Sequence, residues 1–248
     1  MDIPKIFTIS ESAHRIHNPF TAQKYATLGQ VLPMEPGTRI LDLGSGSGEM
    51  LCTWARDHGI FGIGIDMSQL FSKQATLRAA ELGVSQQVSF VHADATGYIA
   101  EEKCDIAACV GATWIAGGVA GTVRQLEQSL KPGGIILIGE PYWRQIPATE
   151  EIAQSCGATA VADFLSLAEL IASFDPLGYD VVEMVLADQE GWDRYEAAKW
   201  LTMRRWLEAN QDDEFATEVR EQLRSSPGRH VTFTREYIGW GVFALMKR

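Results

Sequence analysis

Residues 39–48, RILDLGSGSG, join a short apolar strand to a glycine-rich loop, and a helical pattern begins directly afterwards at Glu49. Ligands of open α/β sheets bind at the carboxyl ends of the strands, which is where this loop lies. Glycine suits such a loop because it tolerates positive φ, and because a Cβ would keep a ligand away from the backbone. The stretch therefore predicts a ligand-binding α/β sheet.

Strands and helices alternate along the chain after this loop. Four further apolar runs are expected to form strands, at 61–65, 88–92, 105–110 and 134–139. Helical patterns precede or separate them, at 21–31, 49–58, 69–82 and 119–130. Strands that alternate with helices of about ten residues favour βαβ units, whose right-handed crossovers give a doubly wound, mostly parallel sheet.

The pattern changes beyond Glu140. A turn-rich segment is followed by a helix at 166–174, a strand at 179–186, a long helical stretch at 192–210 and a closing strand at 237–246. No linker divides the chain, so we predict one α/β domain with a late helical insertion.

Composition excludes several classes of partner. The 248 residues carry 32 acidic and 21 basic side chains, a net charge of -11, which repels phosphate backbones and anionic membrane surfaces. No apolar run approaches the roughly 18 residues of a membrane-spanning helix. The four cysteines form no CxxC pair and are expected to be reduced. We predict a cytoplasmic protein that binds neither nucleic acid nor membrane.

The glycine spacing bears on the kind of cofactor. A dinucleotide fingerprint would place its third glycine at position 49, where this chain has Glu49. A carboxylate at the start of that helix would repel a pyrophosphate. This disfavours an NAD-dependent oxidoreductase, which stays as an alternative on the same fold.

Acidic residues follow two further strands. Asp66 is placed to accept hydrogen bonds from ribose hydroxyls, and Met67 after it could lie against an adenine ring. At the end of the next strand, Asp94 could accept from an exocyclic amino group and Ala95 could donate its backbone N–H. This pattern predicts an adenosine-containing ligand.

Four ordered motifs resemble the class I S-adenosylmethionine-dependent methyltransferases: LDLGSGSGEM (41–50), GIGIDMS (62–68), HADA (92–95) and CDIAACVGATW (104–114). KPGGIILIGEP (131–141) resembles the fifth strand of that family, so the match covers about residues 38–140. The C-terminal half, with GWDRYEAAKW and REYIGWGVFAL, resembles uncharacterised bacterial small-molecule methyltransferases. The resemblance implies a Rossmann-like sheet of seven strands, mostly parallel, with an antiparallel last strand.

The resemblance also implies S-adenosyl-L-methionine as the cofactor and assigns roles to residues. Gly44, Ser45 and Gly46 would hold the methionine moiety, with Asp42 orienting the loop and reaching the amino group. Asp66 would hold the ribose. The adenine contacts would be Met67, Asp94 and Ala95, and the edge of the sulfonium site would be Val110 and Gly111.

The implied reaction is an in-line displacement at the methyl carbon, for which the enzyme mainly supplies alignment. A general base is needed only if the acceptor atom carries a proton of high pKa. The candidate catalytic residues are His17 and Glu140, while Trp114 would form an aromatic wall for an apolar, aromatic or cationic acceptor. Other candidate bases are His14, Tyr142 and His230.

The acceptor is expected to be a small molecule, and the protein a monomer or homodimer. His14 and His17 show no acidic neighbours in the helical pattern, so no metal site is predicted. We divide the domain, residues 1–248, into an N-terminal helical lid (1–37), a cofactor-binding core (38–140), a substrate-side insertion with the sixth strand (141–236) and the last strand (237–248). A non-catalytic S-adenosylmethionine-binding protein is a further alternative.

Overall fold

The structure is a computed structural model that describes residues 3–248, so the first two residues of the predicted lid lie outside the described residues. Its strands are β1 (Arg39–Leu43), β2 (Phe61–Asp66), β3 (Val88–His92), β4 (Cys104–Val110), β5 (Leu130–Trp143), β6 (Tyr179–Leu186) and β7 (Ile238–Lys247). They form one seven-stranded sheet in the order β3-β2-β1-β4-β5-β7-β6. Strands β1 to β5 pair in parallel, and β7 runs antiparallel to both β5 and β6. This confirms the predicted mostly parallel sheet with an antiparallel last strand.

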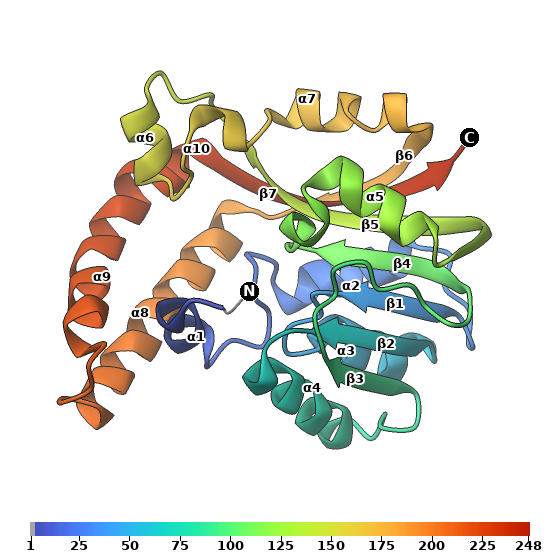
Figure 1. Ribbon diagram of the computed structural model, residues 1–248, viewed down its shortest axis with the longest axis horizontal. Coiled ribbons are helices and arrows are strands. Elements are labelled where there is room, and N and C mark those ends of the chain that lie inside the picture. The colour runs from blue at the N-terminus through green and yellow to red at the C-terminus, as the bar shows by residue number, and fades with distance from the viewer. Residues whose placement is uncertain (1–2) are drawn as a thin grey trace.

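Helices cover both faces of the sheet (Figure 1). On one face pack α2 (Ala22–Val31), α3 (Glu49–His58) and α4 (Gln69–Glu81), where Leu28 and Trp54 belong to one buried apolar cluster. On the other face pack α5 (Val119–Glu127) and α7 (Leu167–Ala172), where Leu126 and Phe174 belong to a second cluster. The two clusters together enclose the central strands, which read as apolar runs because they are buried on both faces.

Three helices lie beyond the carboxyl ends of the parallel strands (Figure 1). They are α1 (Lys5–Glu11), α8 (Gln189–Ala209) and α9 (Ala216–Arg229). A third apolar cluster joins them, formed around Ile9, Met203 and Val219. This cluster places the N-terminal segment beside α8, although about 180 residues separate them in sequence.

Shorter elements complete the chain. They are α6 (Glu150–Ser155), α10 (Arg235–Tyr237), a π-helical stretch at His230–Thr234 and 3-10 turns at Thr113–Ala116, Val161–Asp163 and Asp175–Leu177. Within residues 3–248, no helix is long and apolar enough to cross a membrane.

Several elements differ from the sequence predictions. Strand β5 does not end at Gly139 but continues to Trp143, because its last residues pair with β7. Helix α5 ends at Glu127, three residues before the expected end. Helix α9 was not predicted, since it contains Pro227 and its few apolar residues pack on α8 instead of on the sheet.

Candidate active site

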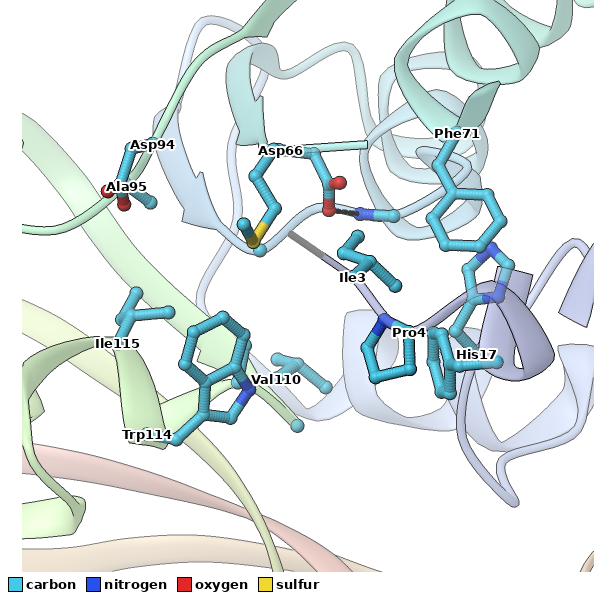
Figure 2. Close-up of a pocket in the computed structure, with 16 residues that line it drawn as sticks. Ile3, Pro4, His17, Asp66, Phe71, Asp94, Ala95, Val110, Trp114 and Ile115 are labelled. Carbon is cyan, nitrogen blue, oxygen red and sulfur yellow. Dashed lines mark hydrogen bonds between the residues drawn. The ribbon is translucent and has the colours of Figure 1, made fainter. Parts of the chain in front are cut away.

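A cavity of about 330 Å³ lies at the carboxyl ends of the parallel strands (Figure 2). It is lined by eight of the ten predicted cofactor residues: Gly44, Gly46, Asp66, Met67, Asp94, Ala95, Val110 and Gly111. The other two, Asp42 and Ser45, line a smaller pocket of about 30 Å³ that shares Gly44 and Gly46 with the main cavity. The fold therefore gathers all ten residues, which come from four strand ends, around one site.

The glycine loop leads from β1 into α3 with φ of +75° at Gly44, +54° at Gly46 and +71° at Gly48. These values lie in the left-handed region that glycine adopts without strain. A Cβ on Gly44 would also lie 2.6 Å from the Cβ of Ala112, and one on Gly46 would lie 2.6 Å from Cδ2 of His17. Neighbouring protein atoms, as well as a ligand, therefore demand glycine here.

Asp66, at the end of β2, holds the glycine loop in place through hydrogen bonds to backbone amides. Its Oδ2 accepts a hydrogen bond from the Gly46 amide and its Oδ1 accepts one from the Ser68 amide, both at 2.8 Å. The side chain is 8% exposed and lines the cavity. Because each carboxylate oxygen can accept a second bond, Asp66 is held ready for two adjacent hydroxyl groups.

Asp42 is the least satisfied charge of the site. It is 3% exposed, and its Oδ1 has no hydrogen-bond partner among the described residues. Burial, together with the negative charge of Asp66, raises the pKa of Asp42 to about 8. A buried carboxylate without a partner is costly, and a ligand cation in the adjoining pocket would relieve that cost. This side chain fits the ammonium group of an amino-acid ligand.

Asp94 differs from these two carboxylates because it is exposed to solvent. It accepts a hydrogen bond from the Thr96 amide at 2.9 Å, and this bond lowers its pKa. Ala95, which follows it, is buried, and its carbonyl accepts a bond from Gln125. The loop after β3 is thereby held at the rim of the cavity.

Apolar side chains form a second part of the cavity lining, its apolar half. Trp114, on the turn after β4, is 55% exposed, and Ile115 follows it. Ile3, Pro4 and Phe7 reach the same cavity from the N-terminal segment, and Figure 2 labels the first two. This half of the cavity favours an apolar or aromatic group.

Of the three predicted catalytic residues, two line the main cavity and one does not. His17 and Trp114 line the cavity, but both ring nitrogens of His17 contact protein side chains, Glu11 and Ser47. Glu140 is absent from the lining, and its Oε2 accepts a hydrogen bond from the Thr113 hydroxyl at 2.7 Å. Burial raises the pKa of Glu140 to about 7.

The other candidate bases lie outside the lining of this cavity. His14 contacts the carbonyl of Tyr195, His230 pairs with Asp193, and Tyr142 is buried in β5. Within residues 3–248, no group of three or more His, Cys, Asp or Glu side chains is arranged to hold a metal ion.

Glu49 has a partner that the sequence did not reveal. Its carboxylate oxygens accept two hydrogen bonds from Arg78, each at 2.8 Å. The ion pair offsets the charge of Glu49, so repulsion of a pyrophosphate is a weaker argument than the glycine spacing suggested.

Several lining residues were missed by sequence reasoning. In the main cavity these are Ile3, Pro4, Phe7, Phe71, Ala112 and Ile115, and in the small pocket they are Arg15, Ile16, Asn18, Tyr25, Glu49 and Met50. Phe71 could have been found, because it lies in the first turn of the helix after Asp66. The N-terminal residues carry no comparable signal, since only tertiary packing brings them to the cavity.

Comparison with known proteins agrees with the geometry. A methyltransferase-domain family model matches residues 40–134. The uncharacterised protein YjhP of Escherichia coli (strain K12) is 75% identical over the whole length of both chains. A 27-O-demethylrifamycin SV methyltransferase of Amycolatopsis mediterranei is 24% identical over 84% of this chain and 76% of its own.

A solved structure is similar over the full length. The S-adenosylmethionine-dependent methyltransferase of Geobacter sulfurreducens, crystallised with S-adenosyl-L-homocysteine, is 72% identical, with a TM-score of 0.98 over 100% of this chain and 99% of that one. Because this full-length similarity coincides with a cavity that presents the buried carboxylate of Asp66 beside a glycine loop, the chain belongs to the class I S-adenosylmethionine-dependent methyltransferases.

Proposed function

We propose that this protein transfers the methyl group of S-adenosylmethionine to a small-molecule acceptor with an apolar or aromatic body. The observation that carries the proposal is the make-up of the cavity, in which the buried carboxylate of Asp66 and the glycine loop adjoin the apolar side chains of Trp114, Ile3, Pro4 and Phe7. The relative named for 27-O-demethylrifamycin SV supports a small-molecule acceptor.

The polar half would hold the cofactor, which supplies a methyl group activated by its sulfonium. Asp66 would accept hydrogen bonds from the ribose, and Asp42 would pair with the ammonium group beside the glycine loop. Met67, Asp94 and Ala95 would contact the adenine. Val110 and Gly111, at the end of β4, would lie at the edge of the sulfonium site between the two halves.

The apolar half would align the acceptor. Holding two reactants in a productive geometry can lower a barrier by about 7–11 kcal/mol, so the reaction needs no covalent nucleophile. Trp114 offers an exposed ring for stacking. The modest size of the cavity, about 330 Å³, favours an acceptor of low molecular mass.

We propose Glu140 as the base for an acceptor that carries a proton, acting through one bridging water molecule because its side chain does not line the cavity. A carboxyl group with a pKa of about 7 exchanges protons readily at neutral pH. Its bond to Thr113, which directly precedes Trp114, connects it to the acceptor side of the cavity. An acceptor without such a proton would leave Glu140 without this role.

The broader expectations are also proposals. We propose one catalytic domain in which residues up to 37 act as a lid and residues 141–236 form the acceptor side, in a cytoplasmic monomer or homodimer. The net charge of -11 supports a partner other than nucleic acid.

An acceptor screen tests the proposal. The protein is incubated with S-adenosylmethionine and with phenols, apolar amines, carboxylates, phosphate esters and tRNA, and formation of S-adenosylhomocysteine is measured. We expect turnover with apolar or aromatic acceptors. Turnover confined to carboxylates, phosphate esters or tRNA would contradict the apolar acceptor class, and calorimetric preference for NAD(H) would contradict the cofactor.

The Glu140→Gln variant tests the base. For a hydroxyl acceptor, the wild-type rate should rise as pH increases through about 7, because the carboxylate form is the active one. The variant should be slow throughout, with an unchanged dissociation constant for S-adenosylhomocysteine. A wild-type pH profile retained by the variant would remove Glu140 from this role.

A further inference from the structure

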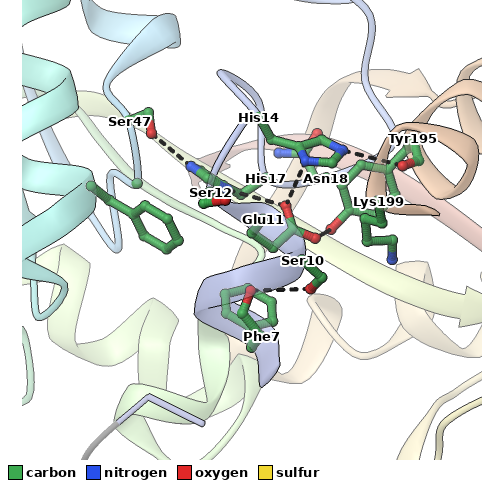
Figure 3. Close-up of polar contacts among 12 residues, drawn as sticks. Phe7, Ser10, Glu11, Ser12, His14, His17, Asn18, Ser47, Tyr195 and Lys199 are labelled. Carbon is green, nitrogen blue, oxygen red and sulfur yellow. Dashed lines mark hydrogen bonds and ion pairs between the residues drawn. The ribbon is translucent and has the colours of Figure 1, made fainter. Parts of the chain in front are cut away.

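A buried carboxylate joins the N-terminal segment to the rest of the molecule (Figure 3). Glu11, at the end of α1, is 1% exposed. Its Oε1 accepts a hydrogen bond from the Tyr195 hydroxyl of α8 at 2.7 Å, and its Oε2 lies 3.2 Å from Nδ1 of His17. Nδ1 of His14 is 3.6 Å from the same oxygen. Sequence reasoning found no acidic neighbour for these histidines, yet Glu11 faces both.

The other side of His17 contacts the glycine loop. Its Nε2 is 2.8 Å from the hydroxyl oxygen of Ser47, which lies between Gly46 and Gly48. The ring also stacks on Phe71 of α4, with ring centroids 4.1 Å apart. A Cβ on Gly46 would collide with this ring, so His17 rests directly on the loop assigned to the cofactor.

The directions of the hydrogen bonds follow from their partners. The side-chain amide nitrogen of Gln74 donates to the carbonyl oxygen of Ser12 at 2.8 Å, which orients the amide and turns its Oε1 toward Ser47. Since Oε1 can only accept, the single hydroxyl hydrogen of Ser47 goes to Gln74 at 2.7 Å. The Ser47 oxygen must then accept a hydrogen bond from Nε2 of His17. Nδ1 of His17 faces the carboxylate of Glu11, which can also only accept a hydrogen bond.

Both ring nitrogens of His17 therefore donate, so the ring is an imidazolium paired with the carboxylate of Glu11. The state of Glu11 agrees with this. Its burial acts to raise its pKa, but the hydrogen bond from His17 and the positive charge of Lys199 hold the pKa below its usual value.

We propose that His17 and Glu11 form a charged latch that holds the N-terminal segment closed over the cofactor and thereby slows release of S-adenosylhomocysteine. His17 is a positioning residue, because both of its nitrogens are used by Glu11 and Ser47. Opening the segment moves Ile3, Pro4 and Phe7 away from the cavity, and it separates His17 from Ser47 of the glycine loop and Glu11 from Tyr195 of α8. Both of these hydrogen bonds involve a charged side chain, so their loss opposes opening. The proposal rests on the proposed function only for the identity of the cofactor.

The test measures how fast S-adenosylhomocysteine leaves the full-length protein, by stopped-flow displacement. Glu11→Gln removes the charge but keeps the shape, and His17→Gln leaves a single amide in place of two charged donors. We expect both variants to release the ligand at least about tenfold faster than the wild type. Glu35→Gln, an exposed glutamate before β1, is the matched control and should release it at the wild-type rate.

Tyr195→Phe should give an intermediate rate of S-adenosylhomocysteine release. It removes one of the donors to Glu11 and leaves His17 in place, so it should accelerate release less than Glu11→Gln does. A purely structural role would lower the melting temperature of these variants without changing the release rate. Release rates of Glu11→Gln and His17→Gln within twofold of the wild type would overturn the latch.

A second measurement needs no variant. In the wild-type complex with S-adenosylhomocysteine, ¹⁵N spectra of labelled histidine should show a proton on both His17 nitrogens, and a neutral tautomer would refute the assignment. Because neither experiment uses an acceptor, failure of the acceptor screen leaves the latch testable. Failure of the wild type to bind S-adenosylhomocysteine at all would refute both the cofactor assignment and the latch.

Discussion

The two halves of the cavity are built in different ways. The polar half consists of Asp42, Asp66 and the glycine loop, whose positions are set by backbone hydrogen bonds within the sheet. The apolar half consists of Trp114 and the N-terminal residues Ile3, Pro4 and Phe7, of which Trp114 is 55% and Phe7 40% exposed. The rigid half suits a cofactor of constant shape, while the exposed half can vary with the acceptor.

The two halves should also differ in how well they tolerate substitution. Buried carboxylates must be hydrogen-bonded or paired, so each position in the polar half tolerates few alternatives. Contacts between exposed apolar side chains contribute less each and allow many substitutions. A change in the polar half should therefore affect cofactor binding strongly, and a change in the apolar half should affect acceptor use.

The largest effect is expected from Asp66→Ala. The change removes the proposed ribose contact and also leaves the amides of Gly46 and Ser68 without their acceptor. Hydrogen bonds to a charged group contribute about 1.5–3 kcal/mol, so calorimetry should show the dissociation constant for S-adenosylhomocysteine raised by about 10- to 150-fold. Asp66→Asn is the control that keeps one acceptor atom and should lose less. An unchanged constant in the alanine variant would remove Asp66 from the site.

Trp114→Ala should separate the two halves. Because the ring lies on the apolar side and is largely exposed, its loss should leave the dissociation constant for S-adenosylhomocysteine within about twofold of the wild type. Turnover of an aromatic acceptor should fall by about tenfold, which corresponds to about 1.4 kcal/mol of barrier. Parallel losses of cofactor binding and turnover would show that the two halves are not independent.

Asp42→Asn should have the smallest effect on the free protein, and its sign depends on pH. Burial raises the pKa of Asp42 from 3.8 to about 8, so between these values the folded state binds more protons than the unfolded state. Wild-type stability must then fall as pH rises through this range, whereas an asparagine adds no such slope. Without ligand, we expect thermal unfolding at pH 8 to show the variant melting at a higher temperature than the wild type.

Asp42→Asn should also bind S-adenosylhomocysteine more weakly than the wild type. Residue 42 is the proposed partner of the ligand's ammonium group, and asparagine carries no negative charge. Calorimetry with S-adenosylhomocysteine at pH 7 measures this. A variant that melts lower than the wild type at pH 8, or that binds the ligand equally well, would contradict the assigned role of Asp42.

The sequence predicted the polar half well. Asp42, Asp66 and Asp94 were placed at the ends of three strands, and the structure puts them there around one cavity or its side pocket. This worked because parallel strands bring their carboxyl ends to one edge of a sheet, so local patterns suffice to locate such residues. Their chemical roles remain proposals.

The N-terminal contacts could not be predicted. His17 was selected as a candidate base, but its partners Glu11 and Ser47 lie 6 and 30 residues away, and Tyr195 lies 184 residues from Glu11. A sequence shows neither which nitrogen of a histidine is used nor which helix packs beside it. The continuation of β5 past Glu140 was missed for a similar reason, since pairing with the distant β7 stabilises it.

The sequence by itself therefore determined the parallel sheet, the glycine loop and the carboxylates at the strand ends, because hydrophobic period and local backbone preference encode them. Tertiary structure alone decided that α1 lies beside α8, that Glu11 pairs with His17 over the glycine loop, and that Ile3, Pro4 and Phe7 complete the cavity. These contacts depend on the burial of the apolar cluster around Ile9, Met203 and Val219. Such burial is non-directional and joins distant segments without leaving a local pattern in the sequence.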